Sequence, residues 1–178
     1  MQLSQIAILS LFGFALATPQ QQKRAASDIE GDISTLSSGL TAFHTAIKDL
    51  SGSIEDDQAT TYLTTYAGLM ASLKEATSHI KSADSLASSD SETIHSAVDS
   101  LTTEVVDTLK DANSKASIVA SSDYSSQVCQ ALSTLTTETD DFYDALEDII
   151  DSDYVSDVDD FQSTVESSFS TTKSTYGC

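Results

Sequence analysis

The sequence predicts an all-α fold of about five amphipathic helices in an antiparallel bundle. Apolar residues recur every three or four positions along most of the chain. The single proline, Pro19, precedes this periodic region, and no segment alternates apolar and polar residues over a useful length. Turn-forming breaks about every 25 to 35 residues favour chain reversal over the alternative, one long coiled coil.

The first two helices are predicted from two apolar stripes. The first follows Ser27, which we interpret as an N-cap, and comprises Ile29, Ile33, Leu36, Leu40, Phe43, Ile47 and Leu50. A Ser-Gly-Ser turn at residues 51–53 ends it. The second comprises Ala59, Tyr62, Tyr66, Leu69, Leu73, Ala76 and Ile80.

Three further stripes complete the predicted bundle. The third opens at a predicted cap in residues 88–92 and comprises Ile94, Val98, Leu101, Val105, Leu109, Ala112 and Ala116. The fourth comprises Val128, Leu132, Leu135, Phe142, Leu146 and Ile149. The fifth comprises Val155, Val158, Phe161, Val165, Phe169 and Tyr176. The sequence does not reveal the order in which these helices pack.

The N-terminal residues predict secretion. Residues 6–16 form an apolar run that is too short to span a bilayer and that ends in the small-residue site at Ala15–Ala17, so residues 1–17 are predicted to be a signal peptide. The dibasic pair Lys23-Arg24 predicts a pro-peptide at residues 18–24 and a single bundle domain at 25–178. The alternatives are a buried N-terminal helix and a solvated linker.

The charge of the chain argues against two classes of partner. The formal net charge is −20, and loss of Lys23 and Arg24 with residues 1–24 changes it to −22. Without a basic patch, nucleic acids and anionic membranes are disfavoured as partners. Solubility in an acidic or crowded medium is the simplest interpretation of this acidity. The acidic block at residues 138–160 lacks a calcium-loop pattern, so no metal site is predicted.

The sequence contains no recognisable catalytic motif. It has no Gly-x-Ser-x-Gly elbow, no His-Glu-x-x-His pair and no glycine-rich phosphate loop. His44, His79 and His95 fall on separate predicted helices, and we interpret them as exposed residues of polar faces. We therefore expect a protein that is not an enzyme and needs no cofactor.

The two cysteines, Cys129 and Cys178, predict one disulfide. An even pair in an oxidising compartment forms a disulfide more readily than half a zinc site. This bond would tie the last residue of the chain to the body of the bundle.

Large residues on the inward stripes alternate with small ones, which could leave a tunnel. We therefore expect an apolar ligand to be lined by Tyr62, Tyr66, Leu69, Leu132, Phe142, Phe161 and Phe169. The alternative is that these side chains simply pack as an ordinary core.

The chain resembles the fungal hydrophobic surface-binding protein A family, which includes cell-wall galactomannoproteins. The resemblance spans about residues 25–176 and rests on spaced residues: Asp32, Ile33, Leu36, Leu40, Leu132, Leu135, Leu146, Phe169 and Tyr176. It implies an all-helical secreted domain that binds hydrophobic surfaces or long-chain lipids such as fatty acids, with a secreted esterase as a partner in some relatives. Without an anchor signal after Cys178, we expect no covalent attachment to the wall.

Three functions remain open from the sequence. The first is a secreted protein that binds an aliphatic lipid or an apolar surface through the bundle interior. The second is a structural, O-glycosylated cell-wall mannoprotein. The third is a secreted effector that acts on a host protein.

Overall fold

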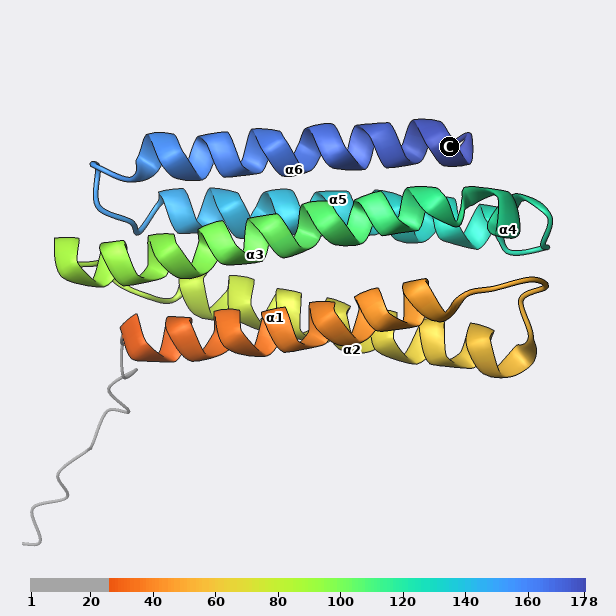
Figure 1. Cartoon of the computed structure of the whole chain (residues 1–178). Helices are drawn as coiled ribbons and strands as arrows, with labels where there is room; N and C mark the ends of the chain where they lie inside the picture. Colours follow the sequence, from red (N-terminus) through yellow and green to blue (C-terminus); the bar gives the residue numbers. More distant parts are fainter. Residues whose placement is uncertain (1–25) are drawn as a thin grey trace, which may run out of the picture.

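Helices account for most of residues 26–178, which are the residues that the computed structural model describes (Figure 1). They are α1 (Ala26–Asp49), α2 (Asp56–Lys81), α3 (Ser88–Ser114), α4 (Ala116–Ala120), α5 (Ser125–Glu147) and α6 (Val155–Tyr176). This part of the chain contains no strand, so the all-α prediction is confirmed. The predicted signal peptide, residues 1–17, and pro-peptide, residues 18–24, lie outside the described residues.

The short helix α4 is the element that the sequence analysis missed. The predicted third helix ran on to Ala116, but α3 ends at Ser114 and Lys115 separates it from α4. The ammonium group of Lys115 donates hydrogen bonds to the carbonyl oxygens of Lys48 and Leu50, both at 2.8 Å, at the end of α1. A cation is favourable at this position because a helix C-terminus presents unpaired carbonyl groups.

The five long helices pack in a closed ring. Helix α1 contacts α2 and α3, α3 contacts α6, α6 contacts α5, and α5 contacts α2. Consecutive long helices reverse direction, as predicted, so that α1, α3 and α6 run one way and α2 and α5 the other (Figure 1). The neighbouring helices α2 and α5, although far apart in the sequence, therefore run side by side in the same direction.

The apolar stripes form the core of this ring. Ile29, Ile80, Ile94 and Leu146 have no exposed surface, and each comes from a different helix. Burying one such side chain stabilises the fold by roughly 1.5–3 kcal/mol. The buried Tyr143 satisfies its hydroxyl group with the hydroxyl of Thr102, at 2.8 Å. At the start of α2, by contrast, Tyr62 and Tyr66 are only half-buried.

The helix caps differ from those predicted. Helix α1 already begins at Ala26, so Ser27 lies within its first turn, and the N-cap of α3 is Ala87, without a side-chain cap. Ser91, from the predicted cap, is instead fully buried, and its hydroxyl accepts a hydrogen bond from the backbone N–H of Asp151 at 2.9 Å. Ser91 therefore links the start of α3 to the loop between α5 and α6.

The structure contradicts the interpretation of the three histidines as exposed residues of polar faces. Each is half-buried and lies against an aspartate of a neighbouring helix. The pairs are His44–Asp111 (2.7 Å), His79–Asp32 (2.7 Å) and His95–Asp157 (3.1 Å). They join α1 to α3, α1 to α2, and α3 to α6. Because the partner acids come from other helices, helical periodicity alone could not pair them.

The C-terminus is fixed by the predicted disulfide between Cys129 and Cys178, which is confirmed. After α6 ends at Tyr176, Gly177 adopts a left-handed conformation, with φ of 74°. A residue without a Cβ takes this conformation without steric strain. The turn at Gly177 brings Cys178 back to the first turns of α5, where Cys129 lies.

No helix within residues 26–178 combines the length and the apolar character needed to cross a membrane.

Candidate functional site

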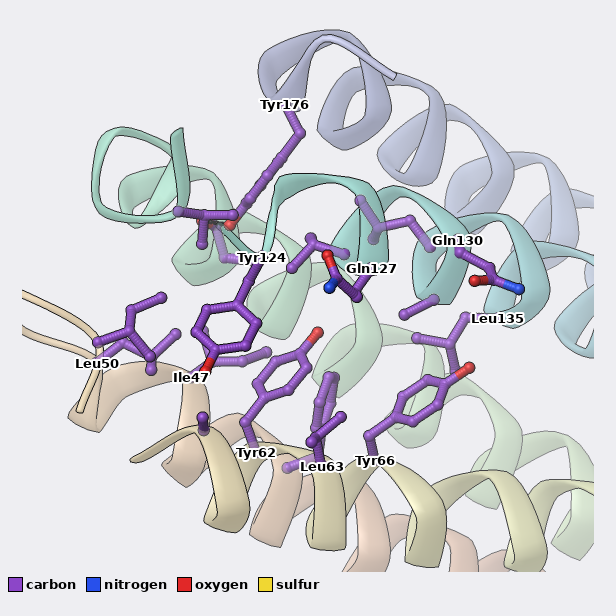
Figure 2. A pocket seen from close by; sticks show the side chains of 18 of the residues that line it. Ile47, Leu50, Tyr62, Leu63, Tyr66, Tyr124, Gln127, Gln130, Leu135 and Tyr176 are labelled. Atoms are coloured by element: carbon purple, nitrogen blue, oxygen red, sulfur yellow. Dashed lines mark hydrogen bonds between the residues drawn. The ribbon is translucent and has the colours of Figure 1, made fainter. Parts of the chain in front are cut away.

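A cavity of about 350 Å³ lies between α2 and α5, and we call it the outer cavity (Figure 2). Its volume falls in the lower part of the range of small-molecule sites, about 300–1,000 Å³. The wall from α1, the following loop and α2 comprises Phe43, Ile47, Leu50, Ile54, Ala59, Tyr62, Leu63 and Tyr66. The wall from α3, α4, α5 and α6 comprises Thr108, Leu109, Ala112, Val119, Tyr124, Gln127, Val128, Gln130, Ala131, Leu132, Thr134, Leu135 and Tyr176.

The outer cavity opens to solvent along the α2–α5 seam. Leu63 is 57% exposed, and Gln127 and Gln130 are also exposed. In Figure 2, Tyr62 and Tyr66 extend from α2 toward α5, where Gln127 and Gln130 lie. The mouth is thus formed by polar tips, whereas the walls behind it are mostly aliphatic and aromatic.

Tyrosine rings shape the α2 wall. The rings of Tyr62 and Tyr66 lie 5.1 Å and 6.1 Å from the ring of Phe43, which holds them by aromatic contact. Burial raises the pKa of Tyr62 above its usual value, with smaller contributions from Tyr176 and Tyr66. Tyr62 therefore presents a neutral hydroxyl group. The hydroxyl groups of Tyr62 and Tyr66 make no hydrogen bond to another of the described residues.

The C-terminal residues close one end of the outer cavity. The hydroxyl of Tyr176 donates to the carbonyl oxygen of Ala112 in α3, at 2.7 Å, and burial raises the pKa of Tyr176 to about 12. Cys178, two residues further on, is bonded to Cys129 of α5. The disulfide therefore keeps the end of α6 beside α5 and holds Tyr176 across the cavity.

A second, smaller space of about 50 Å³, the inner cavity, continues the outer one into the core. Four residues border both cavities: Phe43, Thr108, Leu109 and Leu135. The remaining walls of the inner cavity comprise Leu36, Leu40, Leu69, Leu73, Leu101, Val105, Thr139, Phe142, Tyr143 and Phe169. The two cavities therefore adjoin at these four side chains.

The structure divides the seven predicted lining residues among three places. Tyr62, Tyr66 and Leu132 line the outer cavity. Leu69, Phe142 and Phe169 line the inner cavity. Phe161 lines neither, because its ring packs 5.3 Å from the ring of His95 on the α3–α6 side of the bundle. Six of the seven thus border the two adjoining cavities.

The residues of the mouth were not predicted from the sequence. Leu63, Gln127 and Gln130 lie off the apolar stripes, and Tyr124 precedes α5. The one sequence signal for the mouth is Leu63, a large apolar residue that directly follows Tyr62 and is therefore out of phase with the buried face of its helix.

The lining limits what the outer cavity can do chemically. No charged residue lines either cavity. Within residues 26–178, no group of His, Cys, Asp or Glu side chains is arranged to hold a metal ion. What the outer cavity offers is apolar surface, with hydroxyl and amide groups near its mouth.

Several solved structures have a fold similar to that of this chain, although their sequences are only distantly similar to it. A structure of AfMP4p in complex with palmitic acid is 22% identical, with a TM-score of 0.81, and the match covers 85% of this chain and 99% of that one. Ligand-binding domain 2 of the Penicillium marneffei MP1 protein, complexed with multiple arachidonic acids, is 11% identical, with a TM-score of 0.79 and coverage of 88% and 98%. Ligand-binding domain 1 of MP1, complexed with arachidonic acids, is 10% identical, with a TM-score of 0.78 and coverage of 85% and 99%.

No protein of curated function matches the sequence significantly. The family model for hydrophobic surface binding protein A matches residues 26–148, from the start of α1 to the end of α5. This match covers well over half of the chain. The chain therefore belongs to the hydrophobic surface binding protein A family.

Proposed function

We propose that this chain is a secreted, non-enzymatic protein that binds long-chain lipids, such as fatty acids, by taking their aliphatic chain into the outer cavity. The observation that carries the proposal is an apolar cavity of about 350 Å³ that opens along the α2–α5 seam. Proteins of similar fold have been solved with palmitic and arachidonic acids, which supports the same ligand class here. Secretion rests on the predicted signal peptide at residues 1–17.

The free energy gained by burying an aliphatic chain is large enough for micromolar binding. Burying about 14 methylenes yields roughly 11 kcal/mol, at about 0.8 kcal/mol each. Loss of ligand freedom and ordering of side chains take back several kcal/mol, which leaves a dissociation constant near micromolar. The gain from each added methylene should end where the chain meets Phe43 and Leu135, which separate the outer cavity from the inner one.

Adsorption to apolar surfaces is a second mode of binding, favoured by one observation at the mouth. Leu63 is the exposed large hydrophobic side chain of the described residues, and it lies beside Tyr62 on the rim. An apolar surface that contacts Leu63 would cover the seam through which a lipid enters.

A secreted esterase or a host protein as partner remains a prediction.

Calorimetric titration of fatty acids of increasing chain length tests the proposed function. Affinity should rise about fourfold for each added methylene until the cavity is full. Flat or absent binding across the series would favour a purely structural role.

A blocking variant locates the site. Ala131 is buried and lines the outer cavity, so Ala131→Phe should fill the cavity and weaken binding of every chain length. Ala71 is exposed on α2 and lines neither cavity, so Ala71→Phe is the matched control and should bind normally. Normal binding by Ala131→Phe would place the ligand elsewhere.

A further inference from the structure

The polar groups of the outer cavity are all uncharged. Near the mouth they include the hydroxyls of Tyr62, Tyr66 and Tyr124 and the amides of Gln127 and Gln130 (Figure 2). None of the lysines within residues 26–178 lines either cavity, and the chain has no arginine after Arg24. A carboxylate that enters the outer cavity therefore finds no cation to balance its charge.

Lys115 lies near the outer cavity, because it bonds to a lining residue. Its ammonium group donates to the carbonyl oxygens of Lys48 and Leu50, and Leu50 lines the outer cavity. These bonds hold Lys115 on the end of α1 rather than in the cavity. Meeting a ligand carboxylate would require it to give up both hydrogen bonds.

The surroundings also disfavour a negative charge. Residues 25–178 carry a formal net charge of −22, so their summed field repels anions. The raised pKa of Tyr62 has burial as its main cause, which means that an anion at this position is poorly solvated. The same burial would act on a ligand carboxylate placed next to Tyr62.

The neutral groups at the mouth suit an uncharged oxygen. The Tyr62 and Tyr66 hydroxyls make no hydrogen bond to another described residue, so both can donate to a ligand oxygen. When the Gln127 amide nitrogen donates to the carbonyl oxygens of Asp123 and Tyr124, each at 3.2 Å, its amide oxygen remains an acceptor. An alcohol can both accept from the tyrosines and donate to this oxygen, and an ester can accept.

We propose that the outer cavity selects aliphatic lipids with an uncharged, hydrogen-bonding head group, such as long-chain alcohols or esters, over ionised fatty acids of equal length. This inference rests on the proposed function, because it presumes that an aliphatic chain enters the cavity. A fatty acid meets the requirement in its protonated form, in which its head group is neutral. Tyr62, Tyr66 and Gln127 are then the residues that determine head-group specificity.

The test compares 1-decanol with decanoate at pH 8, where the acid is ionised in water. Calorimetry on the chain from Ala25 to Cys178 should show the alcohol binding at least about tenfold more tightly. Equal affinities, or tighter binding of decanoate, would overturn the inference and leave the proposed function intact. Failure of both ligands to bind would overturn both.

A lysine placed at the mouth should remove most of the selectivity. Gln127 is exposed, so Gln127→Lys can be made without disturbing the core, and it should raise the ratio of decanoate to decanol affinity about tenfold. Ser133 is exposed on the same helix and lines neither cavity, so Ser133→Lys is the control with the same charge change. The control should leave the ratio within about twofold. An equal change in both variants would attribute the selectivity to the overall charge and overturn the role of the mouth.

Discussion

Replacing Leu135 with alanine should lengthen the aliphatic chain that the protein can hold. Leu135 is buried on α5 and borders both the outer and the inner cavity. Removing the isopropyl end of its side chain joins the two spaces, so added methylenes can continue into the core. In the native protein, affinity should rise about fourfold per methylene and then level off when the outer cavity is full.

The size of the effect follows from the atoms removed. Leucine to alanine deletes about three carbons from the wall, so the chain length at which affinity levels off should increase by about two or three methylenes. The same deletion should lower the free energy of unfolding by about 2–5 kcal/mol, because the surrounding core collapses only in part. That loss is large against a total stability of about 5–15 kcal/mol, so titrations need a temperature at which the variant is folded.

Leu146→Ala provides the control for this experiment. Leu146 lies on the same helix, has no exposed surface and lines neither cavity. It should lose comparable stability while its levelling-off point stays that of the native protein. Calorimetric titration of fatty acids that differ by one methylene measures both variants. An unchanged levelling-off point in Leu135→Ala, or an equal shift in the two variants, would refute the role assigned to the shared wall.

Three further predictions concern stability. Reducing Cys129–Cys178, whose separation is 49 residues, should lower the free energy of unfolding by up to about 4 kcal/mol in urea titrations, and an unchanged midpoint would show that the bond contributes little. The hydrogen bond from His44 lowers the pKa of Asp111, so Asp111→Asn should lower the free energy of unfolding above pH 3.8. The difference from the native protein, measured in urea titrations, should disappear in stronger acid, where Asp111 is protonated. A difference that grows in acid would contradict this account. The pKa of Glu147 is raised by burial first and then by neighbouring carboxylates, and its Oε1 atom is buried without a hydrogen-bond partner among the described residues. Glu147→Gln should therefore raise the melting temperature at pH 7 and have little effect below pH 4.5, whereas a lower melting temperature at pH 7 would contradict this account.

The helices could be predicted from the sequence because their cause is local. Ile29, Ile80 and Leu146 each belong to an apolar stripe whose residues recur with a period near 3.6. A helix with such a stripe is stable only when other helices cover the stripe. The ring order could not be predicted, because it depends on how stripes of similar chemistry fit together. The link from Ser91 to Asp151 shows the same limit, since a serine near a helix start is normally a cap and its partner lies 60 residues away.

Of the candidate site, only residues of the cavity walls could be predicted from the sequence. Tyr62 and Tyr66 were expected to face a ligand because they fall on an inward stripe, and they line the outer cavity. Phe161 falls on an inward stripe as well, yet it packs against His95, because periodicity gives the buried face but not the neighbour. Gln127 could not be predicted, since a polar residue at a cavity mouth looks like any solvated residue in the sequence.

The most direct measurement of the central claim is nuclear Overhauser contacts between a ¹³C-labelled fatty acid and the ring protons of assigned tyrosines. Tyr62 and Tyr66 line the outer cavity, whereas Tyr154 lies against His95 and lines neither cavity. The account predicts contacts from the ligand methylenes to the rings of Tyr62 and Tyr66 and none to Tyr154. Contacts to Tyr154 without contacts to Tyr62 and Tyr66, or binding without any contact to these two rings, would contradict it.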